Sequence, residues 1–237
     1  MSETTPPRRL RIAVLSRIFS STGGGAERYS IALVEQLAQR HEIHVFAQAI
    51  HHQWPGVQYH HIAQPFTRPR WLNQLWFAYA SWWRTRRGFD VVHSHELGWS
   101  GQVQTVHVVP VRYSLLQGRS GVAKALRWLK IVTSPRLLAY LALERARYRT
   151  RDGRCIALAS ASQRPLMVQS YPDAVAACEV VTPGVSAVPG AASATQRAAA
   201  RTQLGLPPVG RCVLFVGNDF PKKGLPTLLQ ALAQLPV

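Results

Sequence analysis

Residues 11–40 read RIAVLSRIFSSTGGGAERYSIALVEQLAQR, and this stretch decides the fold class. Its first part, residues 11–19, is a short apolar run that predicts a buried β-strand. A loop of serine, threonine and glycine follows, and residues 26–40 then carry apolar side chains at helical spacing. A strand, a glycine loop and a helix in this order are typical of an α/β protein.

The same alternation continues along the chain. Strands are also predicted at residues 42–48, 57–63, 90–95, 103–109, 155–159 and 179–182, and helices at residues 71–87, 122–131, 137–151 and 164–170. This pattern predicts a Rossmann-like α/β domain, a parallel sheet with helices on both faces. Ligands of such sheets bind at the carboxyl ends of strands, where loops lead into helices, and residues 22–25 lie at such a place.

The composition changes after residue 184, where Ala, Pro, Ser and Gly dominate. We therefore expect an N-terminal domain at residues 1–184 and an interdomain linker at residues 185–209, with a short helix near residues 195–204. The apolar run at residues 211–216 predicts a strand that opens a second Rossmann-like domain. Residues 210–237 hold only its first strand and helix, so we expect that domain to be truncated here.

Net charge is the outlying property of the composition, at +17. Such a charge favours anionic partners. The three cysteines have neither paired nor metal-binding spacing, which is typical of a reducing compartment. The first residues show no apolar signal core, and no run reaches the length of a membrane span. We expect a cytoplasmic location, with peripheral contact to the inner face of the cytoplasmic membrane as a further option.

The glycines at 23, 24 and 25 are the first candidate for a binding site. Glycine allows a ligand to approach the backbone closely, and the free N–H groups of the following helix attract anions. A phosphate or sugar-diphosphate contact is one interpretation, and a flexible turn is the other. The stretch is neither a GxGxxG motif nor a P-loop, so a nicotinamide enzyme is poorly supported.

Six short motifs occur in a fixed order: GGGAER at 23–28, DVVHSH at 90–95, TVH at 105–107, IALAS at 156–160, VTPGV at 181–185 and LFVGNDFPKKG at 214–224. This series resembles the family 4 glycosyltransferases of the GT-B fold, including the lipopolysaccharide-core type. The resemblance covers nearly the whole chain. It implies a nucleotide-sugar as donor substrate, transfer with retention of configuration, and no metal or other cofactor.

The resemblance also implies roles for individual residues in the N-terminal domain. Gly24 and Gly25 match the glycine pair that faces the donor diphosphate and the transferred sugar. Glu27 and Arg28 follow as in the GGxER variants of the family and are expected to line the cleft. His107 matches the histidine at a strand end that contacts the reacting sugar, so we take it as the catalytic residue.

The last motif matches the family signature VGRxxxxKG. Lys223 falls on the lysine that neutralises the donor phosphates, and Lys222 lies beside it. Asn218 stands where arginine is common, which removes one charge-assisted phosphate contact. Lys222 is a candidate to replace that contact. A solvated pair of surface lysines is the alternative interpretation.

The remaining histidines give little sign of a metal site. His93 and His95 lie two residues apart and can share a face of the sheet, but no third ligand has a suitable spacing. We expect His93 to pack inside the sheet and His95 to border the cleft. Glu96 beside it could act as an acid or base by position, although a loop carboxylate is the simpler interpretation.

Positive charge concentrates at residues 112–154, which hold eleven Lys or Arg against Glu144 and Asp152. Before this segment, arginines bracket the aromatic residues 71–83. Basic helices with Trp and Tyr suit an anionic membrane surface. The alternative is that the aromatic side chains pack on the sheet and the arginines are solvated. Nucleic acid is a weaker candidate, since no known binding module is recognised.

The sequence therefore favours a retaining glycosyltransferase that acts on a membrane-linked glycan, such as a lipopolysaccharide core or another cell-envelope polysaccharide. Most donor contacts of a GT-B enzyme belong to the second domain, so we expect these 237 residues alone to be inactive. A non-catalytic remnant is one alternative, and a basic nucleic-acid-binding protein is a less favoured one.

Overall fold

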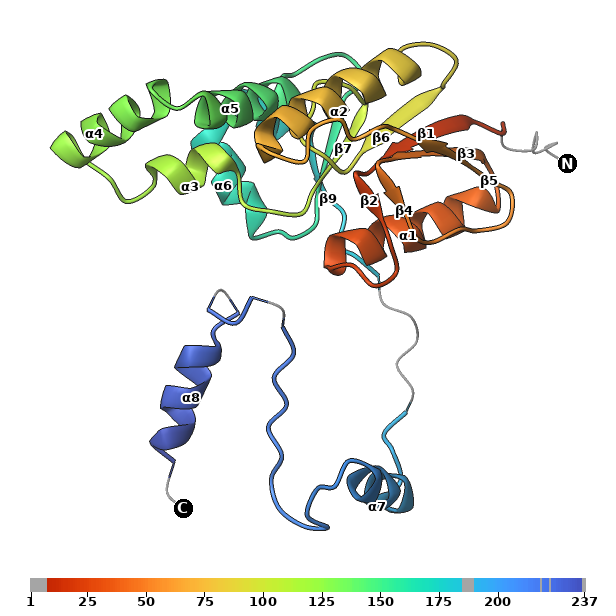
Figure 1. The fold of residues 1–237 in the computed structure, drawn as a ribbon, viewed down its shortest axis with the longest axis vertical. Coiled ribbons are helices and arrows are strands. Elements are labelled where there is room, and N and C mark those ends of the chain that lie inside the picture. The colour runs from red at the N-terminus through yellow and green to blue at the C-terminus, as the bar shows by residue number, and fades with distance from the viewer. Residues whose placement is uncertain (1–7, 185–189, 218, 222, 236–237) are drawn as a thin grey trace, which may run out of the picture. The chain divides into compact units, whose positions relative to one another are not determined.

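The computed structural model describes residues 8–184, 190–217, 219–221 and 223–235. The chain divides into two compact units, Met1–Gly184 and Val185–Val237. Figure 1 shows the strands gathered in the first unit.

A seven-stranded sheet forms the centre of the first unit. Its strands are β1 (Arg11–Leu15), β3 (Glu42–Ala47), β5 (Val57–His61), β6 (Val91–Ser94), β7 (Val103–Val106), β8 (Cys155–Leu158) and β9 (Cys178–Val180). They lie in the order β5-β3-β1-β6-β7-β8-β9, and every neighbouring pair is parallel. The predicted parallel α/β fold is confirmed. The order reverses between β1 and β6, and this switch point is where open α/β sheets bind ligands.

The chain adds small elements that the sequence did not predict. The expected strand at residues 11–19 is split into β1 and a two-residue strand, β2 (Ile18–Phe19), which pairs with β4 (Ala49–Ile50) in a separate small sheet. A short helix, α3 (Val111–Leu116), and a 3-10 helix, η1 (Pro172–Ala177), were also missed. Both are too short to produce a recognisable hydrophobic period.

Helices cover both faces of the sheet. The main helices are α1 (Gly25–Ala38), α2 (Arg70–Thr85), α5 (Pro135–Tyr148) and α6 (Gln163–Ser170), and a further helix, α4 (Gly121–Val132), packs on α5 and α3. Alternate side chains of β1 point to opposite faces, so Ile12 and Val14 pack with Val34 of α1. Ala13 and Leu15 instead pack in the cluster that contains Phe77 of α2. Figure 1 shows α1 and α2 on opposite sides of the strands.

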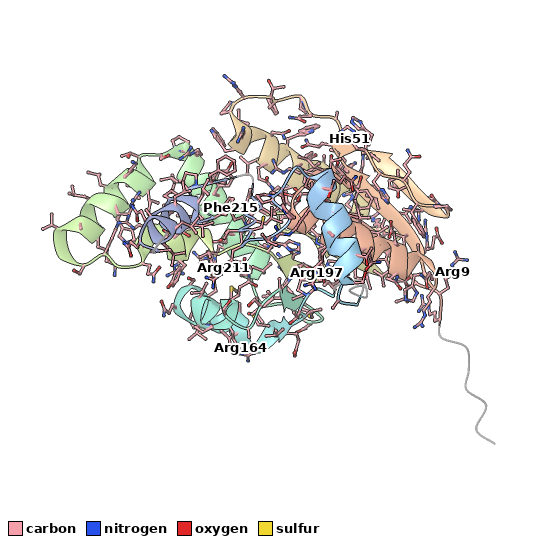
Figure 2. All side chains as sticks on the ribbon, turned by 90° about the horizontal axis from the view of Figure 1, so that it is seen from below. Arg9, His51, Arg164, Arg197, Arg211 and Phe215 are labelled. Atoms are coloured by element: carbon pink, nitrogen blue, oxygen red, sulfur yellow. The ribbon has the colours of Figure 1, made fainter. Side chains whose placement is uncertain are left out.

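A third apolar cluster lies under β7, β8 and β9, where Ile156 and Leu158 are fully buried with Met167 of α6 and Tyr148 of α5. Among the described residues, Arg147 and Arg154 are the buried basic side chains of Lys and Arg type, and the others are at least partly exposed. Arg9 and Arg164 lie at the surface of the unit (Figure 2). The apolar faces of the helices thus build the core, and most of the positive charge remains in contact with solvent.

The second unit contains α7 (Ala194–Gln203) and α8 (Leu225–Ala233). Ser193 caps α7, because its hydroxyl accepts from the Gln196 amide while the Gln196 side chain accepts from the Ser193 amide. The predicted strand at residues 211–216 is wrong, since these residues form no strand. A strand needs a hydrogen-bonded neighbour, and no described residue supplies one. Asn218, Lys222 and Val185, which sequence analysis singled out, lie outside the described residues.

Candidate functional site

The switch point between β1 and β6 is bridged by polar side chains. Arg17 follows β1, and Glu96 follows β6. The backbone amide and the Nε atom of Arg17 donate to the two carboxylate oxygens of Glu96, at 3.1 and 3.0 Å. The His95 amide donates to the Leu15 carbonyl at 3.0 Å, which extends the sheet by one residue. Both carboxylate oxygens of Glu96 are therefore bonded to Arg17, and His95 is held at the carboxyl edge of the sheet.

Three histidines form a stack along β6 and β7. His93 and His95, two residues apart on one face, have ring centroids separated by 4.6 Å, and His95 and His107 by 5.4 Å. Nδ1 of His95 lies 3.0 Å from Nε2 of His107, and Nε2 of His93 lies 2.7 Å from the Thr105 hydroxyl. The expectation that His93 packs inside the sheet is confirmed, because its side chain is buried.

Burial keeps all three imidazoles neutral. Desolvation lowers the pKa of His93 to about 4, with further lowering by His107 and Arg147. Burial, followed by the effects of His93, His107 and Arg147, holds the pKa of His95 well below its ordinary value. Burial and Arg147 also lower the pKa of His107, against an opposing effect of Glu27 and Glu96. The stack therefore consists of uncharged hydrogen-bonding groups at neutral pH.

The hydrogen bond between His95 and His107 fixes which nitrogen carries a proton. Nε2 of His95 is buried and has no partner among the described residues. A buried N–H without a partner costs more free energy than an unpaired lone pair, so we assign the His95 proton to Nδ1. His107 then accepts at Nε2 and carries its own proton at Nδ1. The half-buried His107 ring can thus offer an N–H donor to a ligand.

Helix α1 brings the glycine loop to the same edge of the sheet. Its Tyr29 ring contacts both His95 and His107 edge-on, with centroids 5.9 and 5.4 Å away. Gly24 is the N-cap residue of α1, in an extended conformation with φ −74°. A Cβ atom added to Gly25 would meet nothing within 4 Å. The start of α1 therefore has open space in front of it and unpaired backbone N–H groups.

The structure brings some of the predicted site residues together and leaves others apart. Tyr29 contacts His95 and His107 and so connects them to the start of α1, where Gly24, Gly25, Glu27 and Arg28 lie. Glu27 also acts on His107, because its charge opposes the lowering of the His107 pKa. Lys223, in the second unit, is exposed just before α8. Because each unit is a separate body here, the donor contact expected of Lys223 stays a prediction. So do the roles assigned to the other residues.

Two members of the cluster, Arg147 and Tyr29, were not predicted from the sequence. Arg147 is buried, donates from Nη2 to the Thr105 carbonyl, and acts electrostatically on all three histidines. Tyr29 lies within a stretch that was read only as an apolar helix pattern. The signal for Tyr29 was its place one turn after the glycines. Arg147 gave no local signal, since its partner Thr105 is 42 residues away in sequence and Arg147 lies within a run of basic residues.

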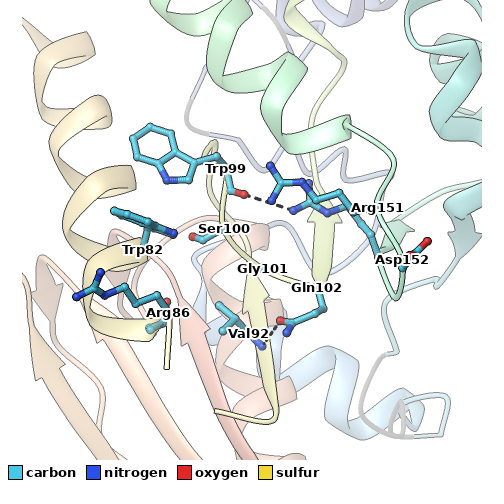
Figure 3. A pocket seen from close by; sticks show the side chains of 11 residues that line it. Trp82, Arg86, Val92, Trp99, Ser100, Gly101, Gln102, Arg151 and Asp152 are labelled. Carbon is cyan, nitrogen blue, oxygen red and sulfur yellow. Dashed lines mark hydrogen bonds between the residues drawn. The ribbon is translucent and has the colours of Figure 1, made fainter. Parts of the chain in front are cut away.

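A small pocket lies elsewhere on the sheet. It has a volume of about 300 Å³ and is lined by Trp82, Arg86, Trp99 and the residues just before β7 and β8. In Figure 3 the Gln102 side chain accepts from the Val92 amide. The Trp99 carbonyl accepts from Arg154. These residues stand at the amino ends of β6, β7 and β8. The pocket therefore lies at the opposite edge from the histidine stack.

The described residues contain no group of three or more His, Cys, Asp or Glu side chains that could hold a metal ion. No helix among them is both long and apolar enough to cross a bilayer. The expectation of a reaction without metal or cofactor stays a prediction.

Residues 23–187 match the model of a family described as Glycosyltransferase Family 4. The chain belongs to this family. The matched region contains the glycine loop, the histidine stack and the switch point. Among curated protein sequences, none matches the chain. The family resemblance inferred from the six motifs is thus confirmed.

Solved structures show the same fold as this family 4 chain. One is WaaG, a glycosyltransferase involved in lipopolysaccharide biosynthesis, with 19% sequence identity and a TM-score of 0.75; the match covers 95% of this chain and 60% of WaaG. Another is Alr3699/HepE of Anabaena in complex with UDP and glucose, with 17% identity and a TM-score of 0.54 over 97% of this chain and 59% of HepE. The family 4 chain spans about 60% of the length of these structures.

Proposed function

We propose that this chain supplies the acceptor-side half of a retaining glycosyltransferase, which moves a sugar from a nucleotide-sugar to a membrane-linked glycan. The observation that carries the proposal is the neutral His95–His107 pair beside the open start of α1, at the switch point of the sheet. Family membership and the UDP and glucose bound to HepE support a nucleotide-sugar as donor. The role of WaaG in lipopolysaccharide biosynthesis supports a cell-envelope glycan as acceptor.

Each group of the site has a task in this proposal. Backbone N–H groups at the start of α1, beside Gly24 and Gly25, stabilise the negative charge of the donor diphosphate. The Nδ1–H group of His107 donates to a hydroxyl of the transferred sugar and orients it. Tyr29 and His95 hold the His107 ring in place. Charge stabilisation of the leaving diphosphate and orientation then supply the catalytic effect.

The second unit would complete the donor site. Lys222 and Lys223 are proposed to neutralise the donor phosphates, with Asn218 beside them. We infer that transfer requires a complete second domain, since closing a two-domain cleft excludes water and assembles the phosphate-binding groups.

The helix α4 is proposed as the contact with an anionic membrane. Val122, Leu126 and Leu129 are 76%, 61% and 58% exposed and stand on one side of the helix. At 100° per residue, Lys130 stands beside this face, Arg127 lies further round, and Lys124 lies on the far side near Ile131, the buried residue of α4. Figure 1 shows α4 at the periphery of the first unit. Exposed apolar side chains next to cations suit the boundary between headgroups and acyl chains.

The aromatic helix α2 is a weaker membrane candidate. Its Phe77 and Ala78 are buried against the sheet, which favours the alternative that this helix mainly covers the core. Trp83 and Tyr79 remain 51% and 46% exposed. The Arg86 guanidinium lies 3.6 Å from the Trp83 ring centroid, so part of the α2 surface is already occupied by a cation–π contact.

A transfer assay tests the proposed function. The chain alone, and the chain extended by a complete second domain, are incubated with radiolabelled UDP-, GDP- and ADP-sugars and a lipopolysaccharide-type acceptor. The extended protein should form product, and NMR of that product should show the anomeric configuration of the donor. An inverted product would contradict retention. No product from any pairing, in a protein with a normal melting curve, would favour the non-catalytic alternative.

A further inference from the structure

A large groove lies along the outer helices of the first unit, and no residue of the histidine stack lines it. Its volume is about 1040 Å³. The walls come from the second half of α5, the segment after α5, the end of α6 and the start of η1, with Arg112 from the start of α3. The floor includes Ala142 and Ala146, which are one helical turn apart on α5. These short side chains leave the space that makes the groove.

Four arginines line this space. Arg112, Arg145, Arg149 and Arg151 all line the groove, and none forms an ion pair with a described residue. Arg145 and Arg149 are one turn apart along the chain. Arg112 lies over the Tyr171 ring, 5.6 Å from its centroid. Asp173 is the carboxylate in the lining, so the groove carries an excess of positive charge.

Some polar groups beside the arginines form hydrogen bonds within the fold, and one does not. The Tyr171 hydroxyl donates to the buried carboxylate of Glu144 at 2.8 Å, and burial together with Glu144 raises the pKa of Tyr171. Glu144 also accepts from the Arg112 amide at 2.9 Å, so its charge is satisfied within the fold. The Ser170 hydroxyl, in contrast, is buried and without a hydrogen-bond partner among the described residues.

We propose that this arginine groove binds a phosphate-bearing ligand. Guanidinium groups recognise phosphate oxygens with pairs of parallel hydrogen bonds, and an anion between the four arginines relieves their mutual repulsion. A volume of this size holds more than one phosphate, which fits a diphosphate or a phosphorylated glycan or lipid headgroup. The proposal does not depend on the proposed sugar transfer.

The test uses inorganic pyrophosphate and the full 237-residue chain. Isothermal titration calorimetry at low salt compares the wild type with the double variant Arg145→Gln/Arg149→Gln. The matched control is Arg40→Gln/Arg87→Gln, which removes the same charge from two exposed arginines that form no ion pair with described residues. The groove variant should bind at least tenfold more weakly, and the control less than about twofold, as expected for a general charge effect.

Vesicles distinguish the two sources of the phosphate. Vesicles with phosphatidic acid and vesicles of equal charge with phosphatidylglycerol are offered to all three proteins. If the groove takes a lipid phosphate, the groove variant loses its preference for phosphatidic acid and pyrophosphate competes with these vesicles. If it takes a soluble or glycan phosphate, vesicle binding is equal in the two variants while pyrophosphate binding is lost. Equal pyrophosphate affinity of the groove variant and the control, or no pyrophosphate binding by the wild type, would overturn the proposal.

Discussion

Nδ1 of His95 and Nε2 of His107 lie 3.0 Å apart at the carboxyl ends of two neighbouring parallel strands. His95 follows β6 at the switch point, and His107 follows β7, so the topology of the sheet creates this pair. Because burial lowers both pKa values, each ring is uncharged with one proton of its own, and the Nδ1–H group of His95 donates to Nε2 of His107. The nearby His93 is also held neutral by burial, so the stability of the first unit should depend on pH.

Acid should destabilise the first unit. His93 has a pKa of about 4 in the folded chain and near 6.5 when unfolded, so the unfolded state binds the proton first as the pH falls. The stability that neutral His93 provides is complete above pH 6.5 and is lost between pH 6.5 and 4. The loss amounts to about 3 kcal/mol for this residue. Urea unfolding followed from pH 7.5 to 4 measures it.

The matched variants are His93→Gln and His51→Gln, of which the second changes an exposed histidine. The His93→Gln protein should lose less stability on acidification than the wild type, since glutamine cannot take up a proton. The His51→Gln protein should follow the wild-type curve. An unchanged pH dependence of His93→Gln would show that this imidazole is not held neutral.

The glycine loop makes a steric prediction. Gly25→Val should leave the melting temperature nearly unchanged, because its Cβ meets nothing within 4 Å. In a protein with a complete second domain, the variant should lower turnover at least tenfold, about 1.4 kcal/mol, since valine blocks the approach of the donor. Gly24→Val should act in the same direction. Normal turnover in both variants would remove this loop from the site.

A contrasting substitution checks the steric argument. A Cβ atom at Gly23 would lie 2.8 Å from Cβ of Glu27, so Gly23→Ala forces the first turn of α1 to move. This variant should melt at a lower temperature than Gly25→Val. The reverse order would mean that the loop has a different conformation in solution.

Membrane binding should depend on charge and on α4. The chain should sediment with anionic vesicles at low salt and be released as ionic strength rises, because salt screens surface charges. Lys124→Gln/Arg127→Gln/Lys130→Gln should weaken sedimentation strongly, since each cation near the surface contributes about 1 kcal/mol. Arg84→Gln/Arg86→Gln/Arg87→Gln removes the same charge from the α2 region and should weaken it less. No preference for anionic over neutral vesicles would refute the membrane contact.

Hydrogen exchange should separate the two units. Amides in β1 and β7 should exchange slowly, because each of these strands is bonded to neighbours on both sides. Residues after Pro208 should exchange fast, since residues 211–214 are exposed and form no strand. Slow exchange at residues 211–216 would show that this segment finds a strand partner in solution.

The sequence predicted the elements whose apolar side chains face a buried sheet. β3 and β8 were recognised because Ile43, Val45, Ile156 and Leu158 form short apolar runs. The end of β7 at His107 followed from the family motif. These signals are local, since each is contained within a few residues.

The misses depended on distant partners. Helix α3 begins where Glu144, more than 30 residues away, accepts from the Arg112 amide. The sequence around Val111 contains no pattern that indicates this contact. Arg147 enters the histidine cluster by the same kind of long-range contact. The wrong strand at residues 211–216 has the opposite cause. Its apolar pattern is that of a strand, but a strand forms only beside another strand. The local pattern does not indicate whether such a neighbour is present.

The most direct test of the account is sugar transfer by His107→Ala in a protein that joins this chain to a complete second domain. Initial rates with the wild type, His107→Ala and the exposed-site control His51→Ala are compared at equal melting temperature. The account predicts a loss of at least 100-fold for His107→Ala, about 2.7 kcal/mol of transition-state stabilisation, and a wild-type rate for His51→Ala. A His107→Ala protein that transfers sugar at the wild-type rate would contradict the assignment of the His95–His107 pair as part of the site of transfer.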